Sequence, residues 1–515
     1  MIPPRGDAYV PGRGIASGVA EQPDPLNAAS LIAILVFAAV LRVHGLGREC
    51  FWYDEVVTMR LARSPSPTAL IHLLERIDGS HAPLHPLLLQ GWVRLFGPSE
   101  TSARTLSAAC GVLTVAMVAL LGRQLFDPAT GRWGAWLTAV SPPLVHYARE
   151  TRMYALLVLL CVVSWWLLLG FRQTALPSRK LAYAGSLAAL FYTHPLGLFM
   201  IAALAVAYLL LRPSLALGLR PWLAIQLGTL IAILPWIWRN LDHTHTDYPI
   251  PLSSVRFLLA IPIEFVGGNS LAFLVCLAII LGGLAASREP GSNFRPATEP
   301  TALLVWLMVP PMLLYLYSYV ITSIFGPPRY HIFIAPAYLL LLARGLVVVP
   351  PPFRWSLAAG GLVLSLSLIQ ADVYSQVVKA DWRGLAGWLQ REQARGAIGG
   401  FRGKPVVVVH PSDPRFPRDQ VEAARYYLEP AWRVVAGAAV GSRDEGGTIA
   451  AELGPVLEVD CLSAEQVRGG FQDPSGLGFR GLVVHLGGDG DEDDGGGSEG
   501  GPPGRTGGGS TADGE

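Results

Sequence analysis

Residues 28–41 read AASLIAILVFAAVL, and shortly after them residues 51–55 read FWYDE. The first stretch is apolar and free of charge, as expected for the centre of a membrane span, which needs about 20 mostly apolar residues. The second stretch places two adjacent carboxylates, Asp54 and Glu55, beyond the end of that span and directly after aromatic residues. Aromatic side chains favour the membrane interface. The sequence therefore predicts a membrane protein with a candidate acidic site where its first span meets water.

The composition agrees with a chain that lies mostly in the membrane. Of its 515 residues, 51% are hydrophobic and only 15% are charged. Soluble domains average about 25% charged residues, so we expect a polytopic α-helical membrane protein. The formal net charge is +1, which points to no charged partner, and we expect no nucleic-acid partner. The five cysteines show no CxxC or other ligand spacing, so neither a disulfide framework nor a zinc site is expected.

Charge-free apolar runs recur along the chain and predict about 11 to 13 spans. One run, 181–211, is too long for a single helix and contains His194-Pro195 at its middle. Because proline removes a backbone donor and clashes with the preceding turn, we expect two spans joined by a tight turn there. Segment 83–97 is read as a helix in the membrane plane, with a spanning helix as the alternative. The runs are 28–41, 105–122, 153–170, 181–211, 221–238, 265–287, 301–328, 330–343 and 355–371.

The distribution of lysine and arginine predicts the orientation of these spans. The loops 171–180 and 212–220 are both basic, and basic loops favour the cytoplasmic side. Counting spans outward from them places Asp54 and the end of the chain on the extracytoplasmic face of the cell (inner) membrane. Polar residues from four separate loops then share that face, namely Asp54, Glu55, His81, Glu150, Arg152, His194 and Arg329.

Four regions are expected along the chain. Residues 1–27 are polar and form a cytoplasmic N-terminal segment, and residues 28–371 form the transmembrane domain, with an extracytoplasmic first loop at 46–100. Residues 372–486 are less apolar and are expected to form a small extracytoplasmic α/β domain. The acidic, Gly-rich residues 487–515 are expected to be disordered.

Within residues 372–486, the pattern predicts an alternation of helices and strands. An amphipathic helix is expected to open at Asp381, because Leu385, Trp388 and Leu389 follow at helical spacing. No GxGxxG or GxxxxGK[ST] loop occurs, so no nucleotide site is predicted. The further expected elements are strands at 405–410, 455–461 and 480–486 and a helix at 418–428.

The acidic pair suggests acid–base chemistry. A carboxylate within hydrogen-bond reach of an attacking hydroxyl can take its proton, so Asp54 is the candidate general base. Glu55 is expected to orient Asp54 or to hold the loop. The alternative is a pair of solvated charges in the first turn of a helix, where the helix dipole favours acids.

The stretch YARETRMY at 147–154 gathers charge at the start of a span. Arg149 and Arg152 are candidate phosphate ligands, since the forked guanidinium matches phosphate oxygens. Glu150 is a candidate supporting acid, and Tyr154 follows within reach of the same ligand. An ion pair with aromatic anchors at the membrane boundary is the alternative.

Several further polar residues lie at predicted span ends. His81, His85 and His194 are candidates for binding phosphate or sugar hydroxyls, with interfacial histidines beside helix-breaking prolines as the alternative. Arg329 and Tyr330 are candidates for contact with a phosphate, or else interfacial anchors. The alternating His243, His245 and Asp247 form only a weak metal pattern, and no metal site is assigned from it.

Taken together, these motifs resemble the GT-C superfamily of integral-membrane glycosyltransferases. The likeness is greatest to the family 39 and ArnT-like branch, which includes protein O-mannosyltransferases and the aminoarabinose transferase of lipid A. It extends from about residue 28 to about residue 430. The matching motifs are WYDE at 52–55, HAPLH at 81–85, ETSAR at 100–104, YARETRMY at 147–154, YTH at 192–194, PRY at 328–330 and DWRG at 381–384.

The resemblance implies a transferase that uses a polyprenyl-phosphate-linked sugar on the outer face. It implies that Asp54 is the catalytic acid of the first loop, that Glu150 belongs to the second acidic motif, and that Arg152 and Arg329 bind the donor phosphate. The acceptor is a hydroxyl or amine of a lipid, glycan or protein, attacked in a single inverting displacement. Some relatives bind a divalent metal, but no decisive ligand set occurs here.

The chain departs from the family pattern in the second motif. His81-Ala-Pro replaces the commoner His-Pro-Pro, and His85 stands where an aromatic residue is usual. The identity of the sugar is therefore left open. Two other classes of function are also left open, a transporter or flippase for lipid-linked sugars and a non-catalytic scaffold of the cell envelope. A transporter favours ionisable residues near the middle of the membrane, whereas the acids here lie at one interface.

Overall fold

The computed structural model describes the chain in eleven stretches and divides it into two compact units, Met1–Arg383 and Gly384–Glu515. The described residues are 25–77, 82–239, 256–286, 298–321, 328–375, 380–395, 406–410, 417–429, 431–436, 456–461 and 482–486. In these stretches the first unit is helical, and the second contains a four-stranded sheet. The expectations for residues 1–24 and 487–515 lie outside the described residues.

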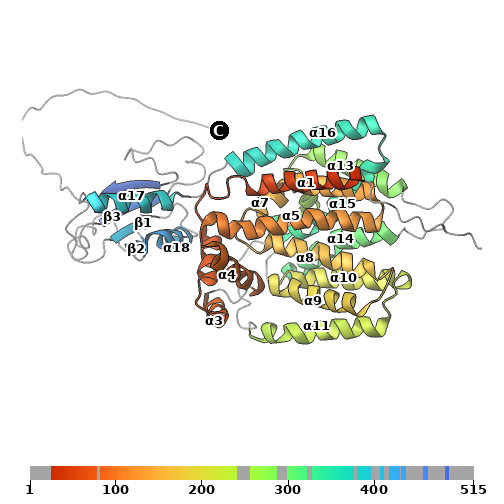
Figure 1. Cartoon of the computed structure of the whole chain (residues 1–515), viewed down its shortest axis with the longest axis horizontal. Helices are drawn as coiled ribbons and strands as arrows, with labels where there is room; N and C mark the ends of the chain where they lie inside the picture. The colour runs from red at the N-terminus through yellow and green to blue at the C-terminus, as the bar shows by residue number, and fades with distance from the viewer. Residues whose placement is uncertain are drawn as a thin grey trace, which may run out of the picture. The chain divides into compact units, whose positions relative to one another are not determined.

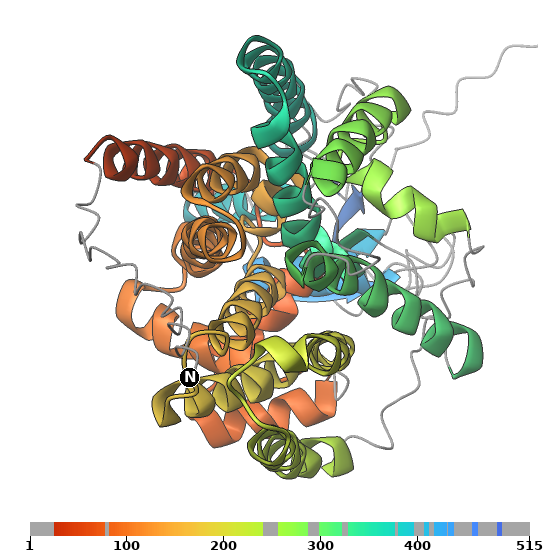
Figure 2. The same cartoon turned by 90° about the vertical axis from the view of Figure 1, so that its right-hand side faces the viewer.

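The first unit is a bundle whose long helices run side by side, with the short helices α3 and α4 at one end (Figure 1). Many of the long helices are seen end-on in Figure 2. The helices are α1 (Pro25–Val43), α2 (Tyr53–Ala62), α3 (Pro67–Ile77), α4 (Leu84–Phe96), α5 (Glu100–Leu125), α6 (Pro128–Val140), α7 (Pro142–Tyr147), α8 (Tyr154–Gly170), α9 (Pro177–Thr193), α10 (Gly197–Leu211), η1 (Arg212–Ser214), α11 (Leu219–Arg239), α12 (Arg256–Glu264), α13 (Ser270–Ala286), α14 (Thr298–Val320), η3 (Pro328–Tyr330), η4 (Ile332–Ile334), α15 (Ala335–Val348), α16 (Pro351–Leu368) and the π-helical η5 (Ile369–Ser375).

The chain is an integral, multi-pass membrane protein, as its composition predicted. Five described helices are long and apolar enough to cross a bilayer, and four shorter helices are similarly apolar. The long ones lie at Glu100–Leu125, Gly197–Ser214, Leu219–Arg239, Glu299–Val320 and Pro351–Tyr374, and the shorter ones at Ala28–Val43, Tyr154–Gly170, Ser270–Ala286 and Ile332–Val348. The total number of spans remains a prediction.

The predicted break at His194 is confirmed. Helix α9 ends at Thr193, His194 is extended, and α10 begins at Gly197. Helix α4, which covers most of the ambiguous segment 83–97, has 13 residues. At 1.5 Å per residue it is about 20 Å long, which is short of the roughly 30 Å hydrocarbon core of a bilayer. Its length thus agrees with the in-plane placement, which stays a prediction.

Close glycine contacts bring α5 and α6 together and so position the loop that follows α6. A Cβ atom on Gly122 of α5 would lie 2.8 Å from the Cα atom of Gly131 in α6. Only glycine allows this approach, and α6 and α7 are thereby held against α5. No apolar run was predicted over α6, because Arg132 interrupts it. The core between the helices includes the stacked rings of Trp165 and Trp306, 5.1 Å apart.

The second unit contains strands in the order β2-β1-β3-β4. β1 runs parallel to β2 and β3, and β4 runs antiparallel to β3. This confirms the predicted α/β character, although the short strand β2 was not predicted. The elements are α17 (Trp382–Arg395), which starts at the end of the first unit, β1 (Val406–His410), α18 (Pro417–Leu428), β2 (Arg433–Ala436), β3 (Val456–Cys461) and β4 (Leu482–Leu486).

Candidate active site

The acidic pair lies in the first turn of α2. Trp52 is the N-cap, and its backbone N–H donates to Glu55 Oε2 over 3.4 Å, so that Glu55 occupies the acidic position of a capping box. Acids in a first helical turn are stabilised by the positive end of the helix dipole. This local arrangement explains why two carboxylates stand side by side, but it places their side chains in different environments.

Glu55 is fully buried and pairs with Arg104 of α5. Arg104 Nε donates to Oε1 over 2.8 Å and Arg104 Nη2 donates to Oε2 over 2.7 Å, which makes the pair bidentate. The backbone N–H of Thr151 also donates to Oε1 over 2.8 Å. Glu55 therefore joins α2, α5 and the 147–154 loop. Of the two roles expected for it, the geometry fits the one that holds the loop, because its oxygens are occupied by protein donors.

Arg104 also fixes the loop that precedes α2. Its guanidinium donates to the carbonyl oxygens of Leu46, Glu49 and Cys50 over 2.6, 2.9 and 3.0 Å, and it lies over the ring of Phe51. Arg104 is itself buried. One side chain from a rigid helix therefore holds most of the path that leads to Asp54.

Asp54 lies between two arginines that come from distant parts of the chain. Its Oδ2 atom is 3.6 Å from Arg152 Nη2 and 3.6 Å from Arg329 Nη1. Charge-assisted hydrogen bonds are usually about 2.7–2.9 Å long, so both contacts are loose ion pairs. Asp54 is partly exposed, in contrast to the neighbouring Glu55. It is thus the member of the acidic pair that an acceptor molecule can reach.

The two arginines differ in how firmly they are held. Arg152 Nη1 donates to the Asp54 backbone carbonyl over 3.2 Å and to Thr58 Oγ1 over 3.0 Å, and only 7% of its side chain is exposed. Arg329 lies on the short turn η3, stacks over Tyr330 at 5.4 Å, and leaves 30% of its side chain exposed. Arg152 is therefore a fixed cation, and Arg329 is the one more open to solvent and to a ligand.

Aromatic rings line the neighbouring part of the site. The rings of Tyr147 and Tyr154 meet edge to face at 5.3 Å, and the ring of His194 lies 6.1 Å from Tyr154. His194 Nδ1 accepts a hydrogen bond from the Leu196 backbone over 3.1 Å. Burial raises the pKa of the Tyr147 phenol, so this side chain stays protonated and can donate a hydrogen bond. Tyr154 and His194, two of the predicted residues, are thus brought together by α8 and the α9–α10 turn.

Glu150 has a partner that the sequence analysis did not single out. His146 Nε2 lies 3.5 Å from Glu150 Oε1, and the two residues are one helical turn apart. The spacing of four residues in the sequence was the available signal, but His146 lies just before the 147–154 motif and outside the predicted apolar runs. Glu150 itself is mostly buried beside Tyr147.

Arg149 points away from Asp54, and the structure does not bring it into the cluster. Its Nη1 atom donates to the carbonyl oxygens of Arg42 and His44 at the end of α1, and its guanidinium lies 4.8 Å from the centre of the Tyr374 ring. A cation at a helix C-terminus is stabilised by the helix dipole. The contacts of Arg149 are therefore those of a helix cap that ties α1 to η5, and its phosphate contact stays a prediction.

A buried cavity with room for about one water molecule lies beside Arg152. It is lined by His85 of α4, by Thr58 of α2 and by Thr193 of α9, among others. His85 is buried, and its Nε2 atom has no hydrogen-bond partner among the described residues. Burial, together with the nearby Arg152 cation, lowers the pKa of His85 to about 3. His85 is therefore neutral at physiological pH and offers no positive charge to a phosphate.

The pKa of His85 predicts a loss of stability in acid. In the unfolded chain a histidine titrates near pH 6.5, whereas in the folded protein the pKa of His85 is about 3. The unfolded state therefore binds the proton first, and the free energy of unfolding should fall as the pH drops from about 6.5 towards 3. We expect His85→Asn to show a shallower decline between pH 7 and 5 in thermal unfolding. A slope equal to that of the unmodified protein would contradict this assignment.

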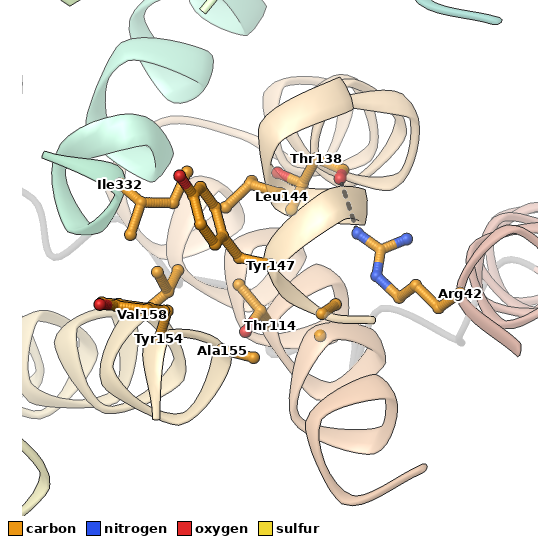
Figure 3. A pocket seen from close by; sticks show the side chains of 11 residues that line it. Arg42, Thr114, Thr138, Leu144, Tyr147, Tyr154, Ala155, Val158 and Ile332 are labelled. Carbon is orange, nitrogen blue, oxygen red and sulfur yellow. Dashed lines mark hydrogen bonds between the residues drawn. The ribbon is translucent and has the colours of Figure 1, made fainter. Parts of the chain in front are cut away.

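A second cavity, shown in Figure 3, lies between α1, α5, α6 and α8 and is lined in part by Arg42, Tyr147 and Tyr154. Arg42 is fully buried, and its guanidinium donates to the carbonyl oxygens of Thr138 and Ala139 at the end of α6 over 3.1 and 3.0 Å. Arg42 thus joins two helices, and its contacts are structural.

Four histidine and aspartate residues considered in the sequence analysis lie outside the described residues. His81 of the second motif lies outside the described residues, as do His243, His245 and Asp247. Within the described stretches, no three His, Cys, Asp or Glu side chains gather closely enough to hold a metal ion.

The comparisons with known proteins show a shared fold. The structure is similar to that of ArnT from Cupriavidus metallidurans in the apo state, with a TM-score of 0.55 and 14% identity over 89% of this chain and 98% of that one. ArnT from the same organism bound to undecaprenyl phosphate gives 0.53 and 16% over 84% and 93%. The Archaeoglobus fulgidus oligosaccharyltransferase in the apo form gives 0.50 and 11% over 86% and 70%. No curated protein sequence matches.

The fold is therefore that of the GT-C membrane glycosyltransferases. Residues 80–238 match the dolichyl-phosphate-mannose-protein mannosyltransferase family. These findings confirm the resemblance to the family 39 and ArnT-like branch that the loop motifs indicated. The matched region includes α4, the 147–154 loop and the α9–α10 turn, which carry His85, Arg152 and His194.

Proposed function

We propose that this protein transfers a sugar from a polyprenyl-phosphate donor to an acceptor hydroxyl or amine on the extracytoplasmic face of the membrane. The observation that carries the proposal is the position of Asp54, a partly exposed carboxylate between two arginines at one end of a GT-C bundle. ArnT, one of the similar structures, is bound to undecaprenyl phosphate, which supports a donor of this kind. Ionisable residues that face a membrane-protein cavity are functional candidates by default.

In the proposed reaction, Asp54 is the general base. The acceptor oxygen or nitrogen attacks the anomeric carbon as Asp54 takes its proton, and the bond from that carbon to the phosphate oxygen breaks. The configuration inverts because there is one displacement. A general base contributes typically 10²- to 10⁴-fold to the rate. The partial exposure of Asp54 fits this role, since an acceptor must approach within hydrogen-bond distance.

Arg152 and Arg329 are proposed to stabilise the phosphate as it leaves. Negative charge grows on the phosphate oxygens in the transition state, and fixed cations at that position lower the barrier. Arg152 is held by Thr58 and by the Asp54 backbone, so it is already oriented before the donor binds. Arg329 is more exposed and only loosely paired with Asp54. When the donor binds, Arg329 can therefore exchange its ion pair with Asp54 for one with the donor phosphate. The Asp54 carboxylate is then able to accept a hydrogen bond from the acceptor.

The other predicted residues are proposed to surround the sugar. Tyr330 stacks under Arg329, and His194 lies beside the buried ring of Tyr154, so these three residues are proposed to form the wall next to the sugar. Glu150, with His146, is proposed as the second acid, which orients a sugar hydroxyl or the acceptor. His85 lies behind this wall in the small cavity beside Arg152, and because it is neutral it is proposed to bind a single water or hydroxyl group there.

The direct test is a donor assay with the full-length protein purified in lipid nanodiscs. Radiolabelled polyprenyl-phosphate sugars, presented with total membrane lipid, glycan and protein acceptors, should be consumed with release of polyprenyl phosphate. Failure of the unmodified protein to consume any donor in the panel would overturn the proposal. The proposed face is checked in whole cells by thiol labelling, where Leu176→Cys should react only after the membrane is opened.

The role of Arg329 gives a separate prediction. Replacement of Arg329 by glutamine should weaken the binding of polyprenyl phosphate about 10- to 100-fold, because a hydrogen bond to a charged group contributes about 1.5–3 kcal/mol. Binding is measured by titration with the purified protein. Arg172→Gln is the matched control, since Arg172 pairs with Glu299 and not with Asp54. Equal affinity in the Arg329 and Arg172 variants would exclude Arg329 as a phosphate ligand.

A further inference from the structure

The short segment Asp381-Trp382-Arg383, which we name the clip, contacts the loop that leads to Asp54. Arg383 Nη2 donates to the Gly47 carbonyl over 3.0 Å, and the Arg383 backbone N–H donates to Cys50 Sγ over 3.4 Å. Asp381 Oδ1 lies 3.8 Å from Cys50 Sγ. Trp382 is buried. The clip contacts this loop although it lies more than 300 residues away in sequence. The proposed transfer reaction gives the clip no role.

The clip also contacts a rigid helix. Arg383 Nη1 lies 3.1 Å from Glu100 Oε1, and Glu100 is the first residue of α5. Gly47 packs directly against the same turn, because a Cβ atom on it would collide with the hydroxyl of Thr101. Arg383 therefore connects the start of α5 to the loop at 46–52. Since α5 also carries Arg104, two arginines link this loop to α5, Arg104 directly and Arg383 through its ion pair with Glu100.

The two anchors hold different groups of the loop. Arg104 binds the carbonyl oxygens of Leu46, Glu49 and Cys50 and reaches on to Glu55. Arg383 binds the Gly47 carbonyl and the side chain of Cys50. The loop ends at Trp52, the N-cap of α2, and Asp54 follows in the first turn. The position of the loop is therefore directly connected, through Trp52, to the turn that carries the Asp54 carboxylate.

We propose that Arg383 is a positioning residue for the sugar transfer, acting through the 46–52 loop to hold Asp54 at the correct angle to the acceptor. This inference rests on the proposed function of Asp54. A misplacement of about 1 Å at a reacting group can cost on the order of 10²-fold in rate, so a contact that fixes a loop can be important for catalysis without touching the substrate.

The kinetic test compares arginine variants in the full-length protein. Arg383→Gln should lower kcat about 10- to 100-fold at saturating donor while the donor KM changes little, because the donor-binding arginines are untouched. Arg383→Lys should recover part of kcat, since it keeps the charge that faces Glu100. Arg395→Gln is the matched control on the same helix, where Arg395 pairs only with Glu392 among the described residues. An unchanged kcat, or a loss confined to KM, would overturn the proposal.

A second test does not depend on activity and uses Cys50, which is buried under the clip. Burial raises the pKa of the Cys50 thiol, so Cys50 reacts slowly with maleimides as long as Arg383 and Asp381 contact it. In the Arg383→Gln variant, peptide-resolved labelling of Cys50 should be several-fold faster than in the unmodified protein, with Cys461 as the internal reference. Equal labelling would show that Arg383 does not hold the loop. If the unmodified protein consumes no donor but Cys50 labelling still rises, the proposed function fails and the clip contact stands.

Discussion

Replacement of Asp54 by asparagine is expected to lower kcat for sugar transfer about 10³-fold while the protein remains folded. Asparagine has nearly the same shape but cannot accept the proton of the acceptor. The carboxylate loses only two loose ion pairs, both at 3.6 Å, so little stability should be lost. The Asp54→Asn variant should also bind polyprenyl phosphate at least as tightly as the unmodified protein, because Arg329 is no longer shared with a carboxylate.

The measurement combines single-turnover transfer with a polyprenyl phosphate titration in the same preparation. Asp127→Asn is the matched control, since Asp127 also pairs with an arginine, Arg344, and caps α6 through its side chain. Asparagine is as good an N-cap as aspartate, so this variant loses an ion pair without losing a helix cap. Sugar transfer by Asp54→Asn at the rate of the control would exclude Asp54 as the base.

The second large effect is expected at Arg104 and concerns stability. Arg104→Ala should lower the free energy of unfolding by about 3–5 kcal/mol, because it leaves the fully buried Glu55 carboxylate without its counter-charge. The carbonyl oxygens of Leu46, Glu49 and Cys50 also lose their donor. Thermal unfolding of the detergent-solubilised protein should show a large decrease, and much of the protein is expected to aggregate on expression.

Two further variants separate the loss of a buried charge pair from a general disturbance. Arg94 also donates to loop carbonyls, but it is exposed. Because of this exposure, Arg94→Ala should lower the free energy of unfolding by only about 0.5 kcal/mol or less. The double variant Arg104→Met with Glu55→Leu should be more stable than Arg104→Ala, since no unpaired charge is then buried. A double variant as unstable as the single one would mean that the carbonyl contacts, and not the ion pair, hold the loop.

The contrast between Asp54 and Glu55 shows where sequence reasoning ended. Both carboxylates occur in one motif, and the helix start that they share is visible in the sequence. Which of them is buried in a bidentate ion pair depends on Arg104, 49 positions away from Glu55. No local pattern reports such a partner, because the contact is made only when α5 packs beside α2. The motif and the family resemblance already favoured Asp54 as the candidate base, and the folded chain adds that Asp54 is partly exposed whereas Glu55 is buried.

Arg149 and Arg152 show the same limit on a single loop. They lie one helical turn apart in sequence and were expected to bind one phosphate together. The chain does not continue as a helix between α7 and α8, so the two side chains diverge, one to the end of α1 and the other to Asp54. Spacing predicts a shared face only where the backbone is regular.

The sequence by itself determined the membrane class, the break at His194, the α/β character of the C-terminal region and the motifs that resemble GT-C glycosyltransferases. The first three properties depend on local composition and periodicity, and the resemblance depends on the order and spacing of the loop motifs. Only the tertiary structure decided that Arg329 lies near Asp54, that Arg149 and Glu55 have structural contacts, that His85 is buried and neutral, and that Arg383 contacts the loop before α2. Each of these depends on contacts between residues far apart in the sequence, and burial and ion pairing are properties of the packed chain.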